Sequence, residues 1–371
     1  MKVFVLLPTH LDAVLWRRRY ELGEVPDIVP YGYHHAADAG CEVRFSRPTL
    51  IDKGPFGLLR RVLNRLLGCD LIHAFNNRAE FVRSQCDVVW THTEYEHLAV
   101  RLIELLSLGR IKAAPMISQS VWLMDRWSTY SALRRLAYRR LLRKSEVLTF
   151  LSPSNAEAAR KRQFGLPVEI VPFGISQDSF PVGCPRDTPN NMPLRVFSLG
   201  NDVHRDWETF AAAFGDQSDF EVRVASRTYP KHLERANIVA RSLNHQSEII
   251  KNYAWADIVV VPLTKNLHAS GLSVLLETVT LGIPVVISDE GGLRHYFGDD
   301  QVNFVPGNDP EKLRTTVRSL ERSVAIAKAT AAQKRLLELD YSSRGYALRH
   351  VTLSRVLTQN HGHHQVASDG K

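Results

Sequence analysis

The stretch over 268–296, which reads HASGLSVLLETVTLGIPVVISDEGGLRHY, constrains the fold of this chain more than any other. Its apolar run over 284–288 ends in turn residues, which is typical of a central strand in a parallel sheet. The segment before it predicts a helix that begins at Ser270, a good N-cap, and stops at Gly282. This order of elements indicates an α/β protein.

The predicted helix has two features that suit an anionic, hydroxyl-bearing ligand. Its first turn, Gly271, Leu272 and Ser273, should leave backbone N–H groups unpaired, and Gly271 would let a phosphate approach the backbone closely. Glu277 stands mid-helix among apolar residues, where an acid needs a polar partner such as a sugar hydroxyl. The competing interpretation is a capped helix packed on a sheet, with Glu277 facing solvent.

These residues resemble the donor-binding segment of family-4 glycosyltransferases of the GT-B fold. In that family a loop, a helix bearing a Glu, a Gly-x-Pro-Val-Val strand and a Gly-rich loop grip the nucleotide-sugar. The resemblance implies that Glu277 binds the ribose. The family often has another Glu at the position of Ala269, so this chain departs from the family where the transferred sugar is contacted.

A second motif, GNDVHRDWETFAAAF, follows a predicted strand over 194–199. The family has a Gly-Arg pair and then a Lys here, which neutralise the donor diphosphate. In this chain Asn201 replaces the Arg and Arg205 takes the place of the Lys, with His204 beside it. A guanidinium binds phosphate oxygens bidentately. A surface pair of Arg205 with Asp206 or Glu208 remains the alternative. The predicted donor-binding residues are Asn201, Arg205, Ser270, Gly271, Leu272, Ser273 and Glu277.

The N-terminal half also alternates predicted strands, over 3–8, 41–46, 70–75, 87–92, 115–123 and 146–152, with helices. Ligands of open α/β sheets bind at the carboxyl ends of the strands. His92 ends one strand, and we expect it to act as the catalytic residue that contacts the transferring sugar. Thr9 and His10 stand where the family has a glycine pair after the first strand. The predicted acceptor-binding residues are Thr9, His10, Trp16 and Glu94; a solvated rim for Trp16 and a helix-start charge for Glu94 are the alternatives.

The predicted fold is α/β of the GT-B class, with two Rossmann-like, doubly wound parallel-sheet domains facing across a cleft. Residues 1–175 form the acceptor domain, 176–194 a proline-rich linker and 195–340 the donor domain. A helix over 341–358 is expected to cross back to the first domain, before a disordered tail over 359–371.

Charge and cysteine usage limit the possible partners. The net charge is +8, but no zinc finger, RNA-binding aromatic signature or helix-turn-helix is present, so we expect no nucleic acid partner. The four cysteines lack paired spacing, and no apolar run reaches the roughly 20 residues of a membrane span, which favours a cytoplasmic protein. A basic helix is either a solvated face or a contact with an anionic membrane. Its arginines are Arg134, Arg135, Arg139, Arg140 and Arg143.

The resemblance implies a hexosyltransferase-type enzyme that moves a sugar from a nucleotide diphosphate sugar to a hydroxyl acceptor with retention. The acceptor is expected to be a glycan or lipid-linked, in exopolysaccharide or lipid-linked glycan assembly at the cytoplasmic face of the membrane. The sequence lacks D-x-D, the metal-holding pair of the other large glycosyltransferase fold, so we expect no essential metal. We also expect no cofactor, with the nucleotide-sugar as donor substrate. A non-hydrolysing nucleotide-sugar epimerase and a two-lobed sugar-binding protein are the alternatives.

Overall fold

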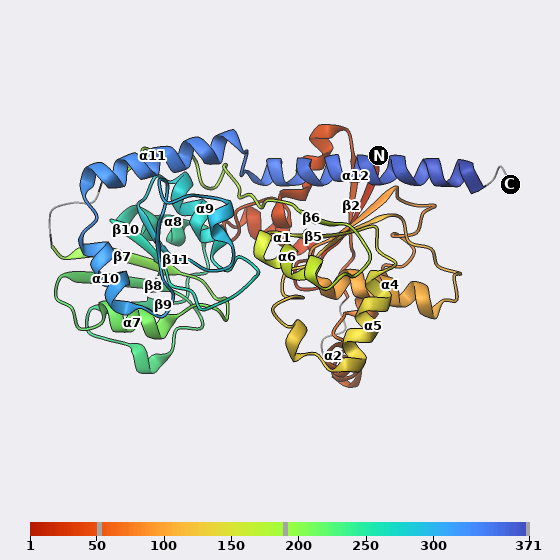
Figure 1. Cartoon of the computed structure of the whole chain (residues 1–371), viewed down its shortest axis with the longest axis horizontal. Helices are drawn as coiled ribbons and strands as arrows, with labels where there is room; N and C mark the ends of the chain where they lie inside the picture. Colours follow the sequence, from red (N-terminus) through yellow and green to blue (C-terminus); the bar gives the residue numbers. More distant parts are fainter. Residues whose placement is uncertain (50–53, 188–191, 369–371) are drawn as a thin grey trace. The chain divides into compact units, whose positions relative to one another are not determined.

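The computed structural model describes residues 1–49, 54–187 and 192–368. They form two compact units (Figure 1). Unit 1 holds residues 1–18, 28–171 and the chain from 344 onward; unit 2 holds 19–27 and 172–343. Unit 2 thus includes 176–194, the predicted linker, where Gly183 N–H donates to Thr280 O at 2.9 Å. No helix among these described residues has the length and apolarity needed to cross a membrane.

Unit 1 is built on a six-stranded parallel sheet in the order β2-β1-β3-β4-β5-β6. The order starts in the middle and grows to both sides, as in a doubly wound fold. Apolar residues of β1 and β3, such as Phe4 and Val89, are fully buried, as a sheet covered on both faces requires. The strands are β1 (Lys2–Leu6), β2 (Glu42–Phe45), β3 (Val88–Thr91), β4 (Met116–Gln119), β5 (Val147–Phe150) and β6 (Val168–Ile170).

The helices of unit 1 are α1 (Ala13–Glu21), η1 (Pro30–Ala39), α2 (Gly54–Leu67), α3 (Leu71–Asn76), α4 (Glu94–Leu106), η2 (Trp127–Thr129), α5 (Ala132–Leu142), α6 (Pro153–Lys161) and α12 (Ser343–Ser368). Helices α4 and α6 pack on this sheet, and other helices of unit 1 pack around them. The C-terminal helix α12 packs on this unit, since Trp90 Nε1 donates to Ser354 Oγ at 2.8 Å.

Two sequence expectations for unit 1 need correction. The predicted strand over 70–75 is helix α3, because the Asp70 carboxylate accepts from His73 N–H and caps a helix there. Helix α12 continues past 358 to Ser368, where a tail was expected, and no proline interrupts it. Residues 369–371 of that predicted tail lie outside the described residues.

Unit 2 repeats the architecture with six parallel strands in the order β12-β11-β10-β7-β8-β9. Its strands are β7 (Leu194–Leu199), β8 (Phe220–Ala225), β9 (Ile238–Arg241), β10 (Ile258–Val261), β11 (Val285–Ser288) and β12 (Asn303–Val305). Its helices are α7 (Trp207–Phe214), η3 (Lys231–Leu233), α8 (Gln246–Trp255), α9 (Leu272–Thr280), η4 (Leu293–His295), α10 (Pro310–Arg318) and α11 (Arg322–Glu338). The order turns outward between β10 and β7, so their carboxyl ends are the expected ligand-binding edge.

Candidate functional site

The loop between β7 and α7 places Arg205 inside unit 2. The Arg205 side chain is buried, its Nε donates to Leu199 O at 3.1 Å, and its Nη1 lies 3.4 Å from Ser270 Oγ. The surface-pair alternative is wrong, because Asp206 caps α7 and Glu208 bonds to His232 instead. Burial lowers the pKa of Arg205 to about 10, so the side chain stays cationic at neutral pH.

Gly200 makes room for this guanidinium. A Cβ atom added at Gly200 would stand 2.2 Å from Arg205 Nε and 2.6 Å from its Cζ. Any side chain at position 200 would therefore push the guanidinium out of its place. The conformation of Arg205 therefore requires glycine at position 200, directly after β7.

Helix α9 supplies the second part of the site, with one correction to its start. Its N-cap is Gly271 with a φ of 84°, while Ser270, the predicted cap, lies one residue earlier. Ser270 is buried, and its N–H donates to Asn266 Oδ1 at 3.1 Å. The Leu272 N–H already donates to Ala269 O, so it is not open to an anion in this conformation. Ser273 is exposed at the helix start.

Glu277 is half-buried on α9 rather than facing solvent freely. Tyr253 from α8 donates its hydroxyl to Glu277 Oε2 at 2.7 Å. Burial raises the pKa of Glu277 to about 7, although the Tyr253 hydrogen bond and the Arg205 charge act against this rise. The carboxyl therefore changes its protonation state near neutral pH and is held in one orientation.

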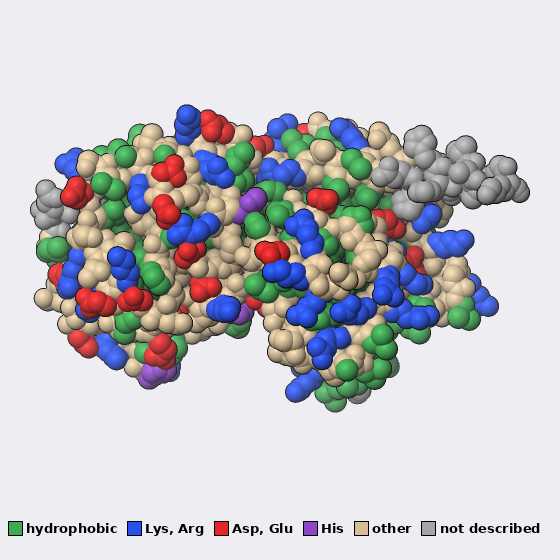
Figure 2. Space-filling view, viewed as in Figure 1, with side chains coloured by type: hydrophobic (Ala, Val, Ile, Leu, Met, Phe, Trp, Pro, Cys, Tyr) green, Lys and Arg blue, Asp and Glu red, His purple; other side chains and the backbone are tan. Residues whose placement is uncertain are grey.

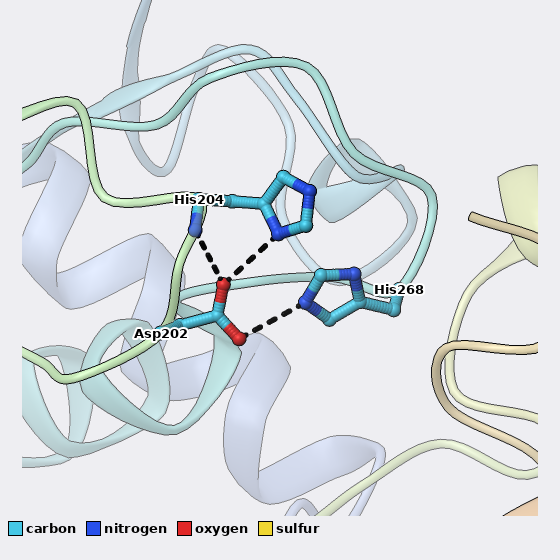
Figure 3. Close-up of side chains that lie close together, drawn as sticks. All are labelled: Asp202, His204 and His268. Atoms are coloured by element: carbon cyan, nitrogen blue, oxygen red, sulfur yellow. Dashed lines mark hydrogen bonds and ion pairs between the residues drawn. The ribbon is translucent and has the colours of Figure 1, made fainter. Parts of the chain in front are cut away.

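Asp202, His204 and His268 form a cluster beside Arg205 that the sequence predicts only in part (Figure 3). Asp202 Oδ1 lies 3.1 Å from His204 Nδ1, and Asp202 Oδ2 lies 3.2 Å from His268 Nε2. His268 comes from the loop before α9, so nothing in local spacing links it to Asp202. One sequence signal could have identified His268: it stands three residues before Gly271, in the loop that leads into the predicted phosphate-binding helix.

Asn201, the remaining donor candidate, has a structural bond. Its Oδ1 accepts from Arg227 N–H at 2.7 Å and ties the loop after β7 to the loop after β8. The structure thus brings Arg205, Ser270 and Glu277 together within unit 2. Asn201 holds the neighbouring loop in place.

His92 in unit 1 lies directly after β3 and is buried. Its ring stacks on Tyr31 with centroids 3.3 Å apart, and its Nδ1 lies 3.0 Å from the Tyr33 hydroxyl. Burial holds the pKa of His92 well below its ordinary value. His92 is therefore a neutral imidazole at physiological pH, suited to a hydrogen bond with a sugar hydroxyl and unsuited to carrying a positive charge.

The acceptor candidates of unit 1 have different surroundings. Thr9 donates to Asp70 Oδ2 at 2.8 Å and accepts from Arg60 Nη2 at 2.6 Å, which makes it part of a buried ion-pair network. His10 is exposed and Trp16 is half-buried.

Glu94 is buried, and its Oε2 accepts from the N–H groups of Val121 and Trp122 at 3.2 Å each. Burial raises the pKa of Glu94. Glu94 thus fixes the loop after β4, while Thr93 caps α4 together with Glu96.

Comparisons with known proteins agree with this architecture. Sucrose-phosphate synthase from Thermosynechococcus elongatus superposes with a TM-score of 0.70 at 16% identity, covering 97% of this chain and 100% of that one. HepE from Anabaena, in complex with UDP and glucose, has a TM-score of 0.63 at 11% identity, with 96% and 100% covered. A glycosyltransferase from Rickettsia africae has a TM-score of 0.63 at 12% identity, with 97% and 99% covered. Among curated proteins, no sequence matches the chain.

A family model matches part of the second unit. Residues 215–335 match the family model of the glycosyl transferases group 1. The fold is that of a GT-B glycosyltransferase. The matched segment of the GT-B chain contains Gly271, Ser273 and Glu277, and it begins after the loop that carries Arg205.

Proposed function

We propose that this GT-B chain transfers a sugar from a nucleoside diphosphate sugar to a hydroxyl acceptor. The observation that carries the proposal is the buried Arg205 guanidinium at Ser270, next to the start of α9, with Glu277 held further along the same helix. A cation and a helix N-terminus neutralise a leaving diphosphate, and a carboxylate accepts from ribose hydroxyls. Because this charge is supplied by protein groups, transfer itself needs no metal in this proposal.

The finer features of the reaction rest on likeness and chemistry. Retention of anomeric configuration follows the family-4 resemblance, and a hexose is the proposed sugar because the HepE structure holds glucose and UDP. UDP is accordingly the first nucleotide to test. The epimerase alternative needs paired acids around the sugar, and Ala269 stands where one of them would be.

Thermal unfolding with a ligand panel tests the proposal. The panel contains UDP, GDP, ADP and their hexose conjugates, each with and without magnesium. We expect one nucleoside diphosphate and its sugar conjugate to raise the unfolding temperature equally in both conditions, because a ligand of the native state stabilises it. A shift with free sugars alone would support a sugar-binding protein, and conversion of the nucleotide-sugar to its isomer would support an epimerase.

The Glu277 carboxyl predicts a pH dependence of donor affinity. The unfolded chain releases this proton near 4.5 and the folded chain near 7, so its contribution to stability falls as pH rises between these values. Donor binding needs the ionised form, so affinity for an intact nucleotide-sugar should rise about tenfold from about pH 6 to about pH 8. Glu277→Gln should bind weakly with a flat profile in calorimetric titrations. An unchanged slope in this variant would remove Glu277 from the ribose site.

We further propose that unit 1 contacts an anionic membrane, where it would meet a lipid-linked glycan acceptor. On α5, Leu133 and Leu136 are 78% and 65% exposed beside the exposed Arg140 and Arg143. Basic and apolar side chains together suit an interfacial helix. Arg135 is half-buried. Two of the predicted contacts have other bonds: Arg134 donates to Arg65 O, and Arg139 donates to Arg162 O.

Helix α2 extends this surface. The Tyr138 hydroxyl of α5 donates to Leu67 O at the end of α2 at 2.9 Å, so the two helices are neighbours. On α2, Phe56 is 71% and Leu66 is 66% exposed, and basic and hydrophobic side chains lie over both helices (Figure 2). An apolar face flanked by arginines on two adjoining helices favours a lipid surface over water alone.

Vesicle sedimentation tests the membrane proposal. We expect the chain to sediment with vesicles that contain phosphatidylglycerol and to stay in solution with phosphatidylcholine alone. Replacing Arg140 and Arg143 by Gln removes two charges worth about 1 kcal/mol each near the surface and should cut binding about 30-fold. The matched control replaces Arg110 and Lys112, which are exposed outside α2 and α5. If both double variants lose vesicle binding equally, net charge alone explains the binding, and the proposed surface is contradicted.

A further inference from the structure

The cluster of Asp202, His204 and His268 offers a carboxylate and two imidazoles to one point in space. Within the described part of the chain it is the one group of three such side chains whose ligand atoms all lie within 4.8 Å of one another. The centroids of the two histidine rings lie 4.9 Å apart, and the ring planes meet at 63°. His204 faces the Asp202 carboxylate with Nδ1, and His268 faces it with Nε2 (Figure 3). His268 is buried, while Asp202 and His204 are half-buried.

The spacing of these atoms suits a metal ion. Ligands at about 2.0–2.2 Å from a tetrahedral zinc are separated by roughly 3.3 Å from each other. The two observed separations are close to that value and involve the two oxygens of one carboxylate: 3.1 Å from Asp202 Oδ1 to His204 Nδ1, and 3.2 Å from Asp202 Oδ2 to His268 Nε2. Small rotations of the rings would bring the two nitrogens near one ion. Each imidazole would bind it in neutral form, with its ring proton on the nitrogen that faces away from Asp202.

The carboxylate is held in place by neighbouring groups. Asp202 Oδ1 accepts from the His204 backbone N–H at 2.8 Å, and Asp202 Oδ2 lies 3.2 Å from His268 Nε2. Ser270 also bonds to this carboxylate, and Arg205 Nη1 lies 3.4 Å from the Ser270 hydroxyl. Such outer partners orient the ligands of metal sites.

We propose that Asp202, His204 and His268 form a binding site for one divalent transition metal of the zinc class, separate from the diphosphate contact of Arg205. Two imidazoles and one carboxylate favour zinc, cobalt or iron over magnesium, which prefers oxygen ligands. The bound metal would join the loop after β7 to the loop before α9. Its binding energy would then stabilise the edge of the sheet that carries Arg205 and Ser270.

Calorimetric titration with zinc tests this site in the full-length chain. The chain is made without an affinity tag and with His361, His363 and His364 replaced by Asn, because the tail histidines could bind zinc themselves. We expect one zinc per chain, and a visible ligand-field spectrum of low symmetry with cobalt. Asp202→Asn and His268→Gln should each weaken zinc binding at least 100-fold, and His204→Gln at least tenfold.

Controls keep the outcome decisive. His232→Gln removes a histidine that pairs with Glu208 on the exposed surface, and it should leave zinc affinity unchanged. Thermal unfolding in a chelator shows whether each variant is folded. If His268→Gln does not fold, His204→Gln still tests the site, because His204 is the more exposed of the two histidines. Equal zinc affinity in the background chain and in His204→Gln and Asp202→Asn would overturn the site. Nucleotide binding in chelator is measured in parallel, so the donor proposal stands or fails separately.

Discussion

Arg205→Ala is expected to weaken binding of the nucleoside diphosphate by about 100-fold, or roughly 3 kcal/mol, in calorimetric titration. The guanidinium is buried and faces Ser270, so its removal takes away the charge that meets the diphosphate. The fold should remain, because Arg205 bonds to the end of β7 and to the loop before α9 and not across the core. Arg205→Lys should recover only part of the affinity, since a single ammonium cannot bind two oxygens in a fixed plane.

The control for this prediction removes an arginine elsewhere on unit 2. Arg318 pairs with Asp219 at 2.6 Å at the start of β8, at the opposite end of the strand from its carboxyl edge. Arg318→Ala lowers the net charge by the same amount and should leave the dissociation constant within about twofold. An Arg205→Ala protein that binds the nucleotide as tightly as the wild type would refute the diphosphate assignment.

Gly174→Ala is expected to destabilise the protein by about 3 kcal/mol. A Cβ at this position would stand 1.9 Å from Ser342 O, a backbone atom that cannot turn aside. The neighbouring residue pairs with the same segment, since Ile175 N–H donates to Tyr341 O at 3.1 Å and Ser343 N–H donates to Ile175 O at 2.7 Å. The added methyl group must push these two chain segments apart.

Urea unfolding measures this effect against a matched glycine. Gly298 also lacks a positive φ, and the nearest atom to an added Cβ is Asp300 Oδ1, the end of an exposed side chain that can move. Gly298→Ala should therefore change the unfolding midpoint little. If the two variants unfold at the same urea concentration, the close approach at Gly174 is not a real constraint.

The sequence predicts most of the fold because buried parallel strands have a strong local signature. The strands predicted over 194–199, 284–288 and 146–152 correspond to β7, β11 and β5. The segment over 70–75 misleads because its apolar composition fits a strand, while the Asp70 cap, a contact between a side chain and a backbone N–H, starts a helix. A cap of this kind depends on local geometry that apolar periodicity does not record.

The sequence predicts the motifs of the site but not the hydrogen bonds between them. Arg205 and Glu277 stand in recognisable motifs, yet the Tyr253 partner of Glu277 comes from a different helix. Glu94 was expected near an acceptor, and it holds the loop after β4 through two backbone N–H groups. His268 meets Asp202 only because two loops end at the same edge of the sheet. Contacts between distant segments require the three-dimensional fold.

Amide hydrogen exchange with and without the preferred nucleoside diphosphate tests the central claim most directly, namely that this ligand binds at the loop after β7 and the start of α9. We predict slower exchange over 200–206 and 266–277, because these backbone groups surround Arg205, Ser270 and Glu277. The strand starts of unit 2, including 194–196, should exchange unchanged. Saturating ligand that leaves 200–206 and 266–277 unprotected, while protecting another part of the chain, would contradict the account.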